Sequence, residues 1–122
     1  MIKVFCHASE VGAALQIKAI ANLLDKCSYS FSFESLGQAK QVLESKPKKD
    51  LETADIAICG FDNIYQDKTS GFIKESREKG IPSIGILDTW KGIDRFFKND
   101  SNLRDLTDVV LVFDNLSKDY LI

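Results

Sequence analysis

The side chains best suited to chemistry in this sequence stand directly after short apolar runs. His7, the only histidine, follows IKVFC, and Asp88 follows SIGIL. A histidine titrates near neutral pH and suits acid or base catalysis, and a positioned carboxylate can take the same role. His7 and Asp88 are therefore the candidate catalytic residues, although the sequence identifies no partner for either.

The segment after the first apolar run could bind a ligand. Ser9 could cap a helix that begins beside it, and Gly12 would allow a backbone or a ligand to approach closely. The start of a helix attracts anions, but Glu10 occupies the same field and would repel a phosphate. Ser9, Glu10 and Gly12 are candidate ligand contacts, with simple capping as the favoured alternative. Their spacing is not the GxGxxG of dinucleotide-binding loops.

Acidic residues also follow the later apolar runs. Asp-Asn pairs occur at 62–63 and 114–115, and Asp88 occupies an equivalent place. Clustered carboxylates there would suit Mg²⁺, but Asp and Asn are also the usual residues of tight turns. We favour turns and expect neither a metal nor a cofactor. Asp62 and Asp88 remain candidate ligand contacts.

The most distinctive segment, LDTWKGIDRFF at 87–97, brings together an acid, the only tryptophan and an arginine. Trp90 in a crevice could stack on a sugar or a base, whereas a buried Trp90 would be a core residue. Arg95 could contact a ligand, or it could pair with Asp88 and close the loop. Trp90 and Arg95 complete the set of candidate ligand contacts.

Strands and helices must alternate along the chain to position these residues. Period-two and short apolar patterns predict strands, and 3.6-residue patterns predict helices. The Tyr-Ser-Phe-Ser-Phe alternation is typical of a half-buried strand towards a sheet edge. Strands are predicted at 2–6, 29–33, 55–59, 83–87 and 109–113, and helices at 11–26, 37–45, 67–79 and about 88–97, with a solvated break at 46–49.

The helix at 67–79 has recognisable ends. Thr69 or Ser70 is expected to be its N-cap, and Gly80 is expected to stop it. Glu75 and Lys79 lie four residues apart, a spacing that allows an ion pair on one helix face.

This alternation predicts an α/β fold. Right-handed crossovers give three layers in a Rossmann-like arrangement, with a mostly parallel five-stranded sheet. We expect the strand order 3-2-1-4-5, and a ligand crevice beyond the carboxyl ends of the strands. The pattern breaks off at residues 120–122, where another helix would begin. We therefore expect 1–122 to be one Rossmann-like domain, the amino-terminal half of a two-domain enzyme or one half of a split enzyme.

Composition narrows the class of protein. Apolar residues make up 44% of the 122 residues and charged residues 28%, which is ordinary for a globular domain. A net charge of -2 argues against nucleic acid as a partner. No apolar run is long enough for a transmembrane segment, and polar residues interrupt every candidate signal peptide. A cytoplasmic location with reduced, mostly buried cysteines is expected.

Four segments resemble the amino-terminal Rossmann-like half of GT-B-type glycosyltransferases and related nucleotide-sugar 2-epimerases. They are FCHASEVGAA, ADIAICGFDN, IPSIGILDTWKGIDRFF and LTDVVLVFDN. The resemblance implies that residues 8–12 face a cleft between two similar domains. It also implies that Asp88, Trp90, Arg95 and Phe96 match elements of polysaccharide-biosynthesis proteins. The partner would be a second Rossmann-like domain or subunit, and the ligand a nucleotide sugar or a glycan acceptor.

Two other hypotheses come from different functional classes. A receiver-like or other small-ligand regulatory module would place an acidic pair at the end of the first strand, where this chain has Cys6 and His7. An assembly subunit without catalysis would dock through Phe96, Phe97 and the carboxyl end, and such a subunit could form a homodimer.

Overall fold

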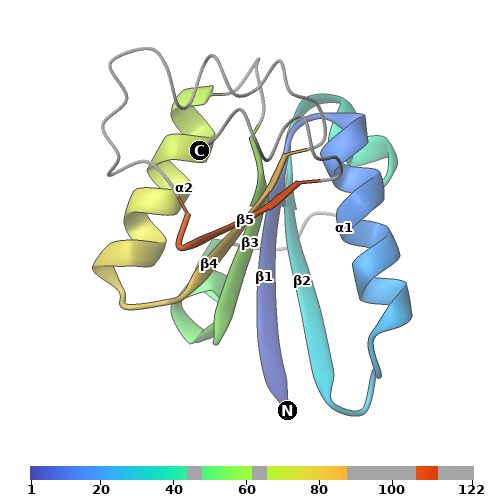
Figure 1. The fold of residues 1–122 in the computed structure, drawn as a ribbon, viewed down its shortest axis with the longest axis vertical. Coiled ribbons are helices and arrows are strands. Elements are labelled where there is room, and N and C mark those ends of the chain that lie inside the picture. Colours follow the sequence, from blue (N-terminus) through green and yellow to red (C-terminus); the bar gives the residue numbers. More distant parts are fainter. Residues whose placement is uncertain (44–47, 62–65, 88–106, 113–122) are drawn as a thin grey trace.

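The computed structural model describes residues 1–43, 48–61, 66–87 and 107–112. Five strands form one parallel sheet, with helix α1 on one side and helix α2 on the other (Figure 1). The α/β Rossmann-like prediction is therefore confirmed. The elements are β1 (Ile2–Ala8), α1 (Val11–Leu23), β2 (Tyr29–Ser35), the 3-10 helices η1 (Gly37–Gln41) and η2 (Lys48–Thr53), β3 (Ile56–Gly60), α2 (Gln66–Glu78), β4 (Ser83–Leu87) and β5 (Val109–Val112).

The predicted strand order, 3-2-1-4-5, is wrong in the placement of β3. The observed order is β2-β1-β3-β4-β5, with β3 between β1 and β4 and β2 at one edge. Strand β3 reads IAICG and has buried residues on both faces, which favours an interior position. Strand β2 alternates aromatic residues with serine and is mostly half-buried, as an edge position allows. From β1 the chain adds β2 on one side and then crosses over to add β3, β4 and β5 on the other side. The strand order therefore switches between β1 and β3.

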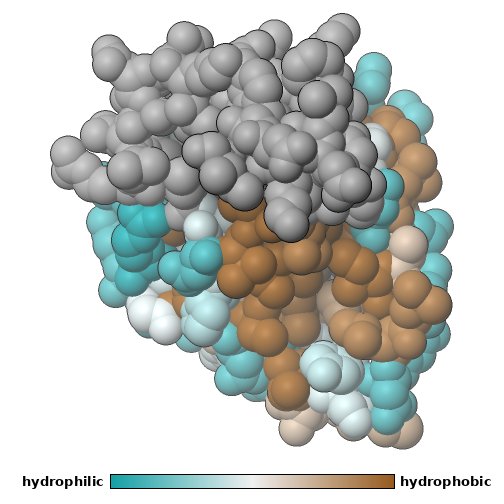
Figure 2. Space-filling model, in the orientation of Figure 1, coloured by the Kyte–Doolittle hydropathy of each residue, from teal (hydrophilic) through white to brown (hydrophobic). Residues whose placement is uncertain are grey.

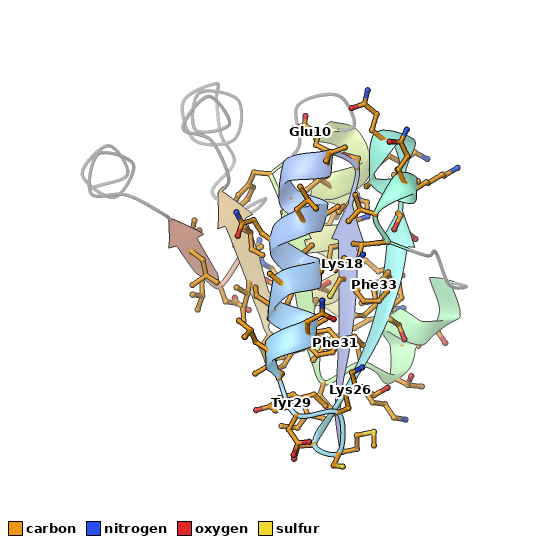
Figure 3. The ribbon with its side chains drawn as sticks, turned by 90° about the vertical axis from the view of Figure 1, so that its right-hand side faces the viewer. Glu10, Lys18, Lys26, Tyr29, Phe31 and Phe33 are labelled. Atoms are coloured by element: carbon orange, nitrogen blue, oxygen red, sulfur yellow. The ribbon has the colours of Figure 1, made fainter. Side chains whose placement is uncertain are left out.

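Side chains of β1 alternate between two hydrophobic clusters, one on each face of the sheet. Val4, Cys6 and Ala8 pack with α1 residues such as Ile17, and Phe5 packs with Phe72 of α2. Phe31 and Phe33 of β2 lie on the α1 face, their ring centroids 6.4 Å apart (Figure 3). The opposite face of β2 carries Ser30, Ser32 and Glu34.

Helix α1 is shorter than predicted and is not capped by Ser9. Its N-cap is Glu10, without a side-chain capping bond, and Ser9 is buried just before it. The helix ends at Leu23, because Asp25 accepts hydrogen bonds from the Cys27 N–H (2.9 Å) and the Ser28 hydroxyl (3.1 Å). These side-chain bonds of Asp25 hold residues 25–28 in a turn, which prevents the helix from continuing. The prediction that the helix reaches residue 26 is therefore wrong.

The structure differs from the prediction at the helix expected at 37–45 and at the break expected at 46–49. The predicted helix at 37–45 is a 3-10 helix that begins at Gly37, whose φ of 53° an ordinary side chain would adopt only under strain. Part of the predicted break at 46–49 belongs to η2, which begins at Lys48.

Helix α2 confirms its predicted stop but not its predicted cap. Lys79 Nζ lies 3.1 Å from Glu75 Oε1, and Gly80 ends the segment with a φ of 70°. The helix begins at Gln66, so Thr69 and Ser70 lie within it. Thr69 is fully buried, and its hydroxyl lies within hydrogen-bond distance of the His7 side chain on β1.

Strand β4 has the predicted bounds, and β5 begins at Val109 as predicted. The predicted helix near 88–97 and the end of the last strand at Phe113 lie outside the described residues. None of the helices in the described ranges combines the length and the apolarity that crossing a membrane requires.

Candidate functional site

The carboxyl ends of the parallel strands form the upper edge of the sheet in Figure 1, and His7 lies at this edge. It is the second-last residue of β1, next to the reversal between β1 and β3. Ligands of open α/β sheets bind beyond this edge at such a reversal. The alternation along β1 points His7 towards α2, and its side chain is fully buried.

Both ring nitrogens of His7 have partners from other elements. Nδ1 lies 2.9 Å from Oε1 of Glu34 on β2, and Nε2 lies 3.2 Å from Oγ1 of Thr69 on α2. An ionised carboxylate only accepts hydrogen bonds, so Nδ1 donates to Glu34. In the tautomer that carries its proton on Nδ1, Nε2 is the acceptor for the Thr69 hydroxyl. The ring also stacks on Phe72, with centroids 5.0 Å apart and an angle of 19° between the planes.

The order carboxylate, imidazole and hydroxyl is that of hydrolase triads, but burial assigns the three groups different roles here. Thr69 and His7 are fully buried, whereas 22% of the Glu34 side chain is exposed. The Thr69 hydroxyl therefore has no access to a substrate. Glu34 is the member that a ligand can reach, and His7 and Thr69 position it. The same contacts tie β1, β2 and α2 together, so they also contribute to stability.

The loop after β2 packs directly against the loop after β1. The Leu36 N–H donates to the Ala8 carbonyl (2.9 Å), and the Ala39 N–H donates to the Ser9 carbonyl (3.4 Å). The buried residue Ser35 ends β2 beside this junction. Glu34 is therefore next to the segment 8–12, which was predicted to face the ligand.

The predicted site residues fall into two groups. Ser9, Glu10 and Gly12 lie at the carboxyl edge: Ser9 is buried, Glu10 begins α1 and Gly12 is in its first turn. Figure 3 shows Glu10 at the top of α1. The other candidates, Asp62, Asp88, Trp90 and Arg95, lie outside the described residues, as do the Asp114-Asn115 pair, Phe96 and Phe97.

Glu34 is the site residue that the sequence reasoning missed. The predicted strand ended at Phe33, so Glu34 was not placed on a strand. The signal was nevertheless present, because the Ser30–Ser32 alternation continues to Glu34. In-register pairing with β1 then places Glu34 opposite His7.

A separate pocket, with a volume of about 280 Å³, lies on the α2 face of the sheet. Residues near the starts of β1 and β2 contribute to it, so it is distinct from the carboxyl edge. Its lining includes Lys3, Phe5, Ser30, Ser32, Thr53 and Ala54.

No three His, Cys, Asp or Glu side chains in the described ranges gather into a group that could hold a metal ion. Cys6 and Cys59 are buried and Cys27 is exposed, and these three described cysteines form no disulfide. Burial raises the pKa of the Cys6 thiol far above its ordinary range.

The chain matches no protein-family model, no curated protein and no solved structure.

Proposed function

We propose that this domain binds a sugar-containing ligand at the carboxyl edge of its sheet. In this proposal it is the amino-terminal, acceptor-side domain of a GT-B-like glycosyltransferase or nucleotide-sugar-modifying enzyme of surface polysaccharide biosynthesis. It acts in the cytoplasm with a second Rossmann-like domain or subunit, which binds the nucleotide sugar. The parallel sheet and the four sequence segments described above support this assignment.

The observation that carries the proposal is the partly exposed Glu34 carboxylate, held by the buried His7 at the strand reversal. Carboxylates accept hydrogen bonds from sugar hydroxyls, and a carboxylate fixed in advance loses little freedom on binding. His7 supplies this fixation, because its own position is set by Thr69 and Phe72.

The same pair suits transfer of a sugar to an acceptor hydroxyl. The acceptor oxygen would form a bond to the anomeric carbon of the donor while the nucleoside diphosphate leaves. The proton of the acceptor hydroxyl would pass to Glu34, with His7 as a positioning residue behind it. In this scheme Glu34 contacts the substrate, and His7 acts through Glu34.

A titration tests the proposal. A panel of mono- and oligosaccharides, which represents the acceptor, is added to the protein while the amide shifts of Ser9 and Glu34 and the fluorescence of Trp90 are followed. Glu34→Gln removes the charge but keeps the shape, and we expect it to weaken saturable binding by about tenfold. Glu75→Gln is the matched control, because Glu75 is similarly exposed (27%) but lies near the far end of α2.

Each outcome has a distinct meaning. Saturable shifts at Ser9 and Glu34 that weaken only in Glu34→Gln support the proposal. Shifts confined to Ser30 and Ser32 would move the ligand to the separate pocket and overturn it. A lack of response at millimolar ligand would overturn ligand binding by this domain.

A small-ligand regulatory module of the receiver type is the second candidate, and the strand order favours it. The order β2-β1-β3-β4-β5 is that of flavodoxin and of receiver domains. The end of β1, however, carries Cys6, His7 and Ala8 rather than an acidic pair. Shifts induced by Mg²⁺ with beryllium fluoride, a phosphoryl mimic, would favour this candidate over the sugar enzyme.

A further inference from the structure

The separate pocket near the starts of β1 and β2 has no role in the proposed function. Its volume of about 280 Å³ is close to the lower limit of small-molecule sites, about 300 Å³. Helix α2 packs mainly on β1, β3 and β4, and β2 carries only the small side chains of Ser30 and Ser32 on this part of its α2 face. These serines leave space beside β1, and the buried Phe5 lines the inner part of that space.

The register of β1 and β2 places an ammonium group beside the serine hydroxyls. Lys3 is the register partner of Ser30, and the next pair on the same face is Phe5 and Ser32. Lys3 shares the face of Phe5, because side chains alternate along a strand, and neighbouring strands lie about 4.8 Å apart. Thr53, at the end of η2, lines the pocket from a third element. An ammonium and three hydroxyls therefore surround one space.

The pocket has an uncompensated positive charge. Lys3 is the only charged residue among the described residues that line it, and its ammonium forms no ion pair in the described ranges. Asp55 accepts a hydrogen bond at Oδ2 from the Lys3 backbone N–H (2.8 Å). Glu52 lies 3.6 Å from Lys79, and Glu34 is bonded to the imidazole on β1. The acids adjacent to the pocket in the chain thus have other partners.

The lining of the pocket differs from the surface on the β5 side of the sheet. Val109 and Leu111 of β5 are 50% and 41% exposed. Figure 2 shows this side, and apolar side chains gather at its centre. A charged ligand would find no hydrogen-bond donors among such side chains. The pocket, by contrast, offers donors around a positive charge, a combination that selects an anion.

We propose that this pocket binds the phosphoryl group of a small phosphate monoester. Lysine binds phosphate as a point charge, and serine and threonine hydroxyls donate to its oxygens. Ser30 and Ser32 are about 7 Å apart along β2, so a phosphoryl group fits between them with a hydrogen bond of about 2.7 Å on either side. Donors from three elements suit a tetrahedral group better than a planar carboxylate.

The size and the openness of the pocket indicate a small ligand. The volume is about nine times the share of one water molecule in the liquid, about 30 Å³, so there is room for an organic group beside the phosphate. Lys3, Ser30 and Thr53 are exposed, which leaves an entrance. The starts of the strands lie at the lower end of the sheet in Figure 1, opposite the carboxyl edge. The site therefore does not depend on sugar binding at Glu34.

A titration of the full chain with glycerol phosphate, inorganic phosphate and glycerol tests the site. We expect glycerol phosphate to shift the amide signals of Ser30 and Ser32 saturably, with a dissociation constant in the millimolar range. Inorganic phosphate should bind more weakly, and glycerol should give no saturable shift. Amide signals of Ser9 and Glu34, which report the carboxyl edge, should not change, so the result is separate from that of the proposed function.

Three variants identify the groups that bind. Lys3→Gln removes the charge but keeps a polar side chain, and we expect it to weaken binding about tenfold. Lys18→Gln is the matched control, because it removes the same charge from an exposed position of α1. Ser32→Val removes a donor and fills space while keeping a residue that strands favour, so it should abolish binding. Circular dichroism checks that each variant is folded.

Each contrary result overturns a stated part of the proposal. No saturable shift at high millimolar glycerol phosphate, or shifts at Ser9 and Glu34 instead, would overturn the site. Equal weakening by Lys3→Gln and Lys18→Gln would reduce the effect to the net charge of the protein and overturn it as well. Equal affinity for inorganic phosphate and glycerol phosphate would overturn the assignment to a monoester.

Discussion

His7 and Glu34 are direct partners in the parallel register of β1 and β2, and their side chains meet at 2.9 Å. Backbone pairing over seven residues therefore sets the position of the Glu34 carboxylate. Thr69 and Phe72 fix the other side of the imidazole from α2. The pair is thus held by three elements that come together only in the folded protein.

Thr69→Val should destabilise the protein by about 1–3 kcal/mol, because it leaves Nε2 of His7 buried without a partner. Valine has nearly the same shape and helix propensity as threonine, so the loss of the hydroxyl dominates the effect. Thr69→Ser keeps the hydroxyl and should recover part of this loss. Urea unfolding measures the difference, and equal stability of the valine variant and the wild type would refute the role of this bond.

Two glycines should respond to alanine in opposite directions. A methyl group on Gly85 would lie 2.6 Å from Thr107 Oγ1 and would also collide with the Phe61 ring, so Gly85→Ala should cost about 1–3 kcal/mol. Gly71 lies inside α2 with nothing within 4 Å of an added methyl group. Gly71→Ala should therefore stabilise the protein by about 0.5–1 kcal/mol. Thermal unfolding of both variants checks the signs, and a tolerated Gly85→Ala would contradict the tight packing of Phe61.

The three thiols should differ in reactivity. Cys27 is exposed, whereas Cys6 and Cys59 are buried, and burial raises the pKa of Cys6 so that little thiolate forms. A disulfide reagent at mildly alkaline pH should therefore label one thiol rapidly in the native protein and all three in denaturant. Cys27→Ser should abolish the rapid phase. Rapid labelling of a second thiol in the native protein would show that one of the buried sites opens.

Asp25 should contribute to the loss of stability in acid. The backbone N–H of Cys27, and after it the Ser28 hydroxyl, hold the pKa of Asp25 below its ordinary value. The unfolded state therefore binds the proton more readily, and the stabilisation that is present above about pH 4 falls as the pH drops through the folded pKa.

Asp25→Asn is the test of this pH dependence. The amide oxygen can still accept the bond from Cys27 but does not titrate in this range. The difference in urea midpoint between wild type and variant should shrink from neutral pH towards about pH 2. A difference that does not change with pH would contradict the contribution of the Asp25 charge.

The fold could be predicted from local patterns, but the order of the strands could not. Period-two and apolar runs identified all five strands to within a few residues, since these patterns reflect which faces are buried. Strand order depends on which strand is buried on both faces. The apolar run at 56–60 indicates a strand that is buried on both faces, but the run at 83–87 is equally apolar. The pattern alone therefore does not show which of these strands lies next to β1.

The site was predicted in part. Segment 8–12 was correctly placed at the carboxyl edge, because it follows the first strand directly. The contacts of His7 depend on two residues that are 27 and 62 positions away in the chain. Thr69 was expected to cap a helix, since the start of α2 at Gln66 carries no sequence signal as clear as Thr69-Ser70. Long-range pairing, rather than local propensity, decided both roles.

The central place of β1 has a consequence for the folding of the newly made chain. Strand β1 leaves the ribosome before either of its neighbours, yet its pairing with β3 requires residues up to Cys59. Until then the apolar residues of β1 have no complete sheet to join. Chaperone contacts with the nascent chain should therefore concentrate on this first strand and should end once β3 has emerged.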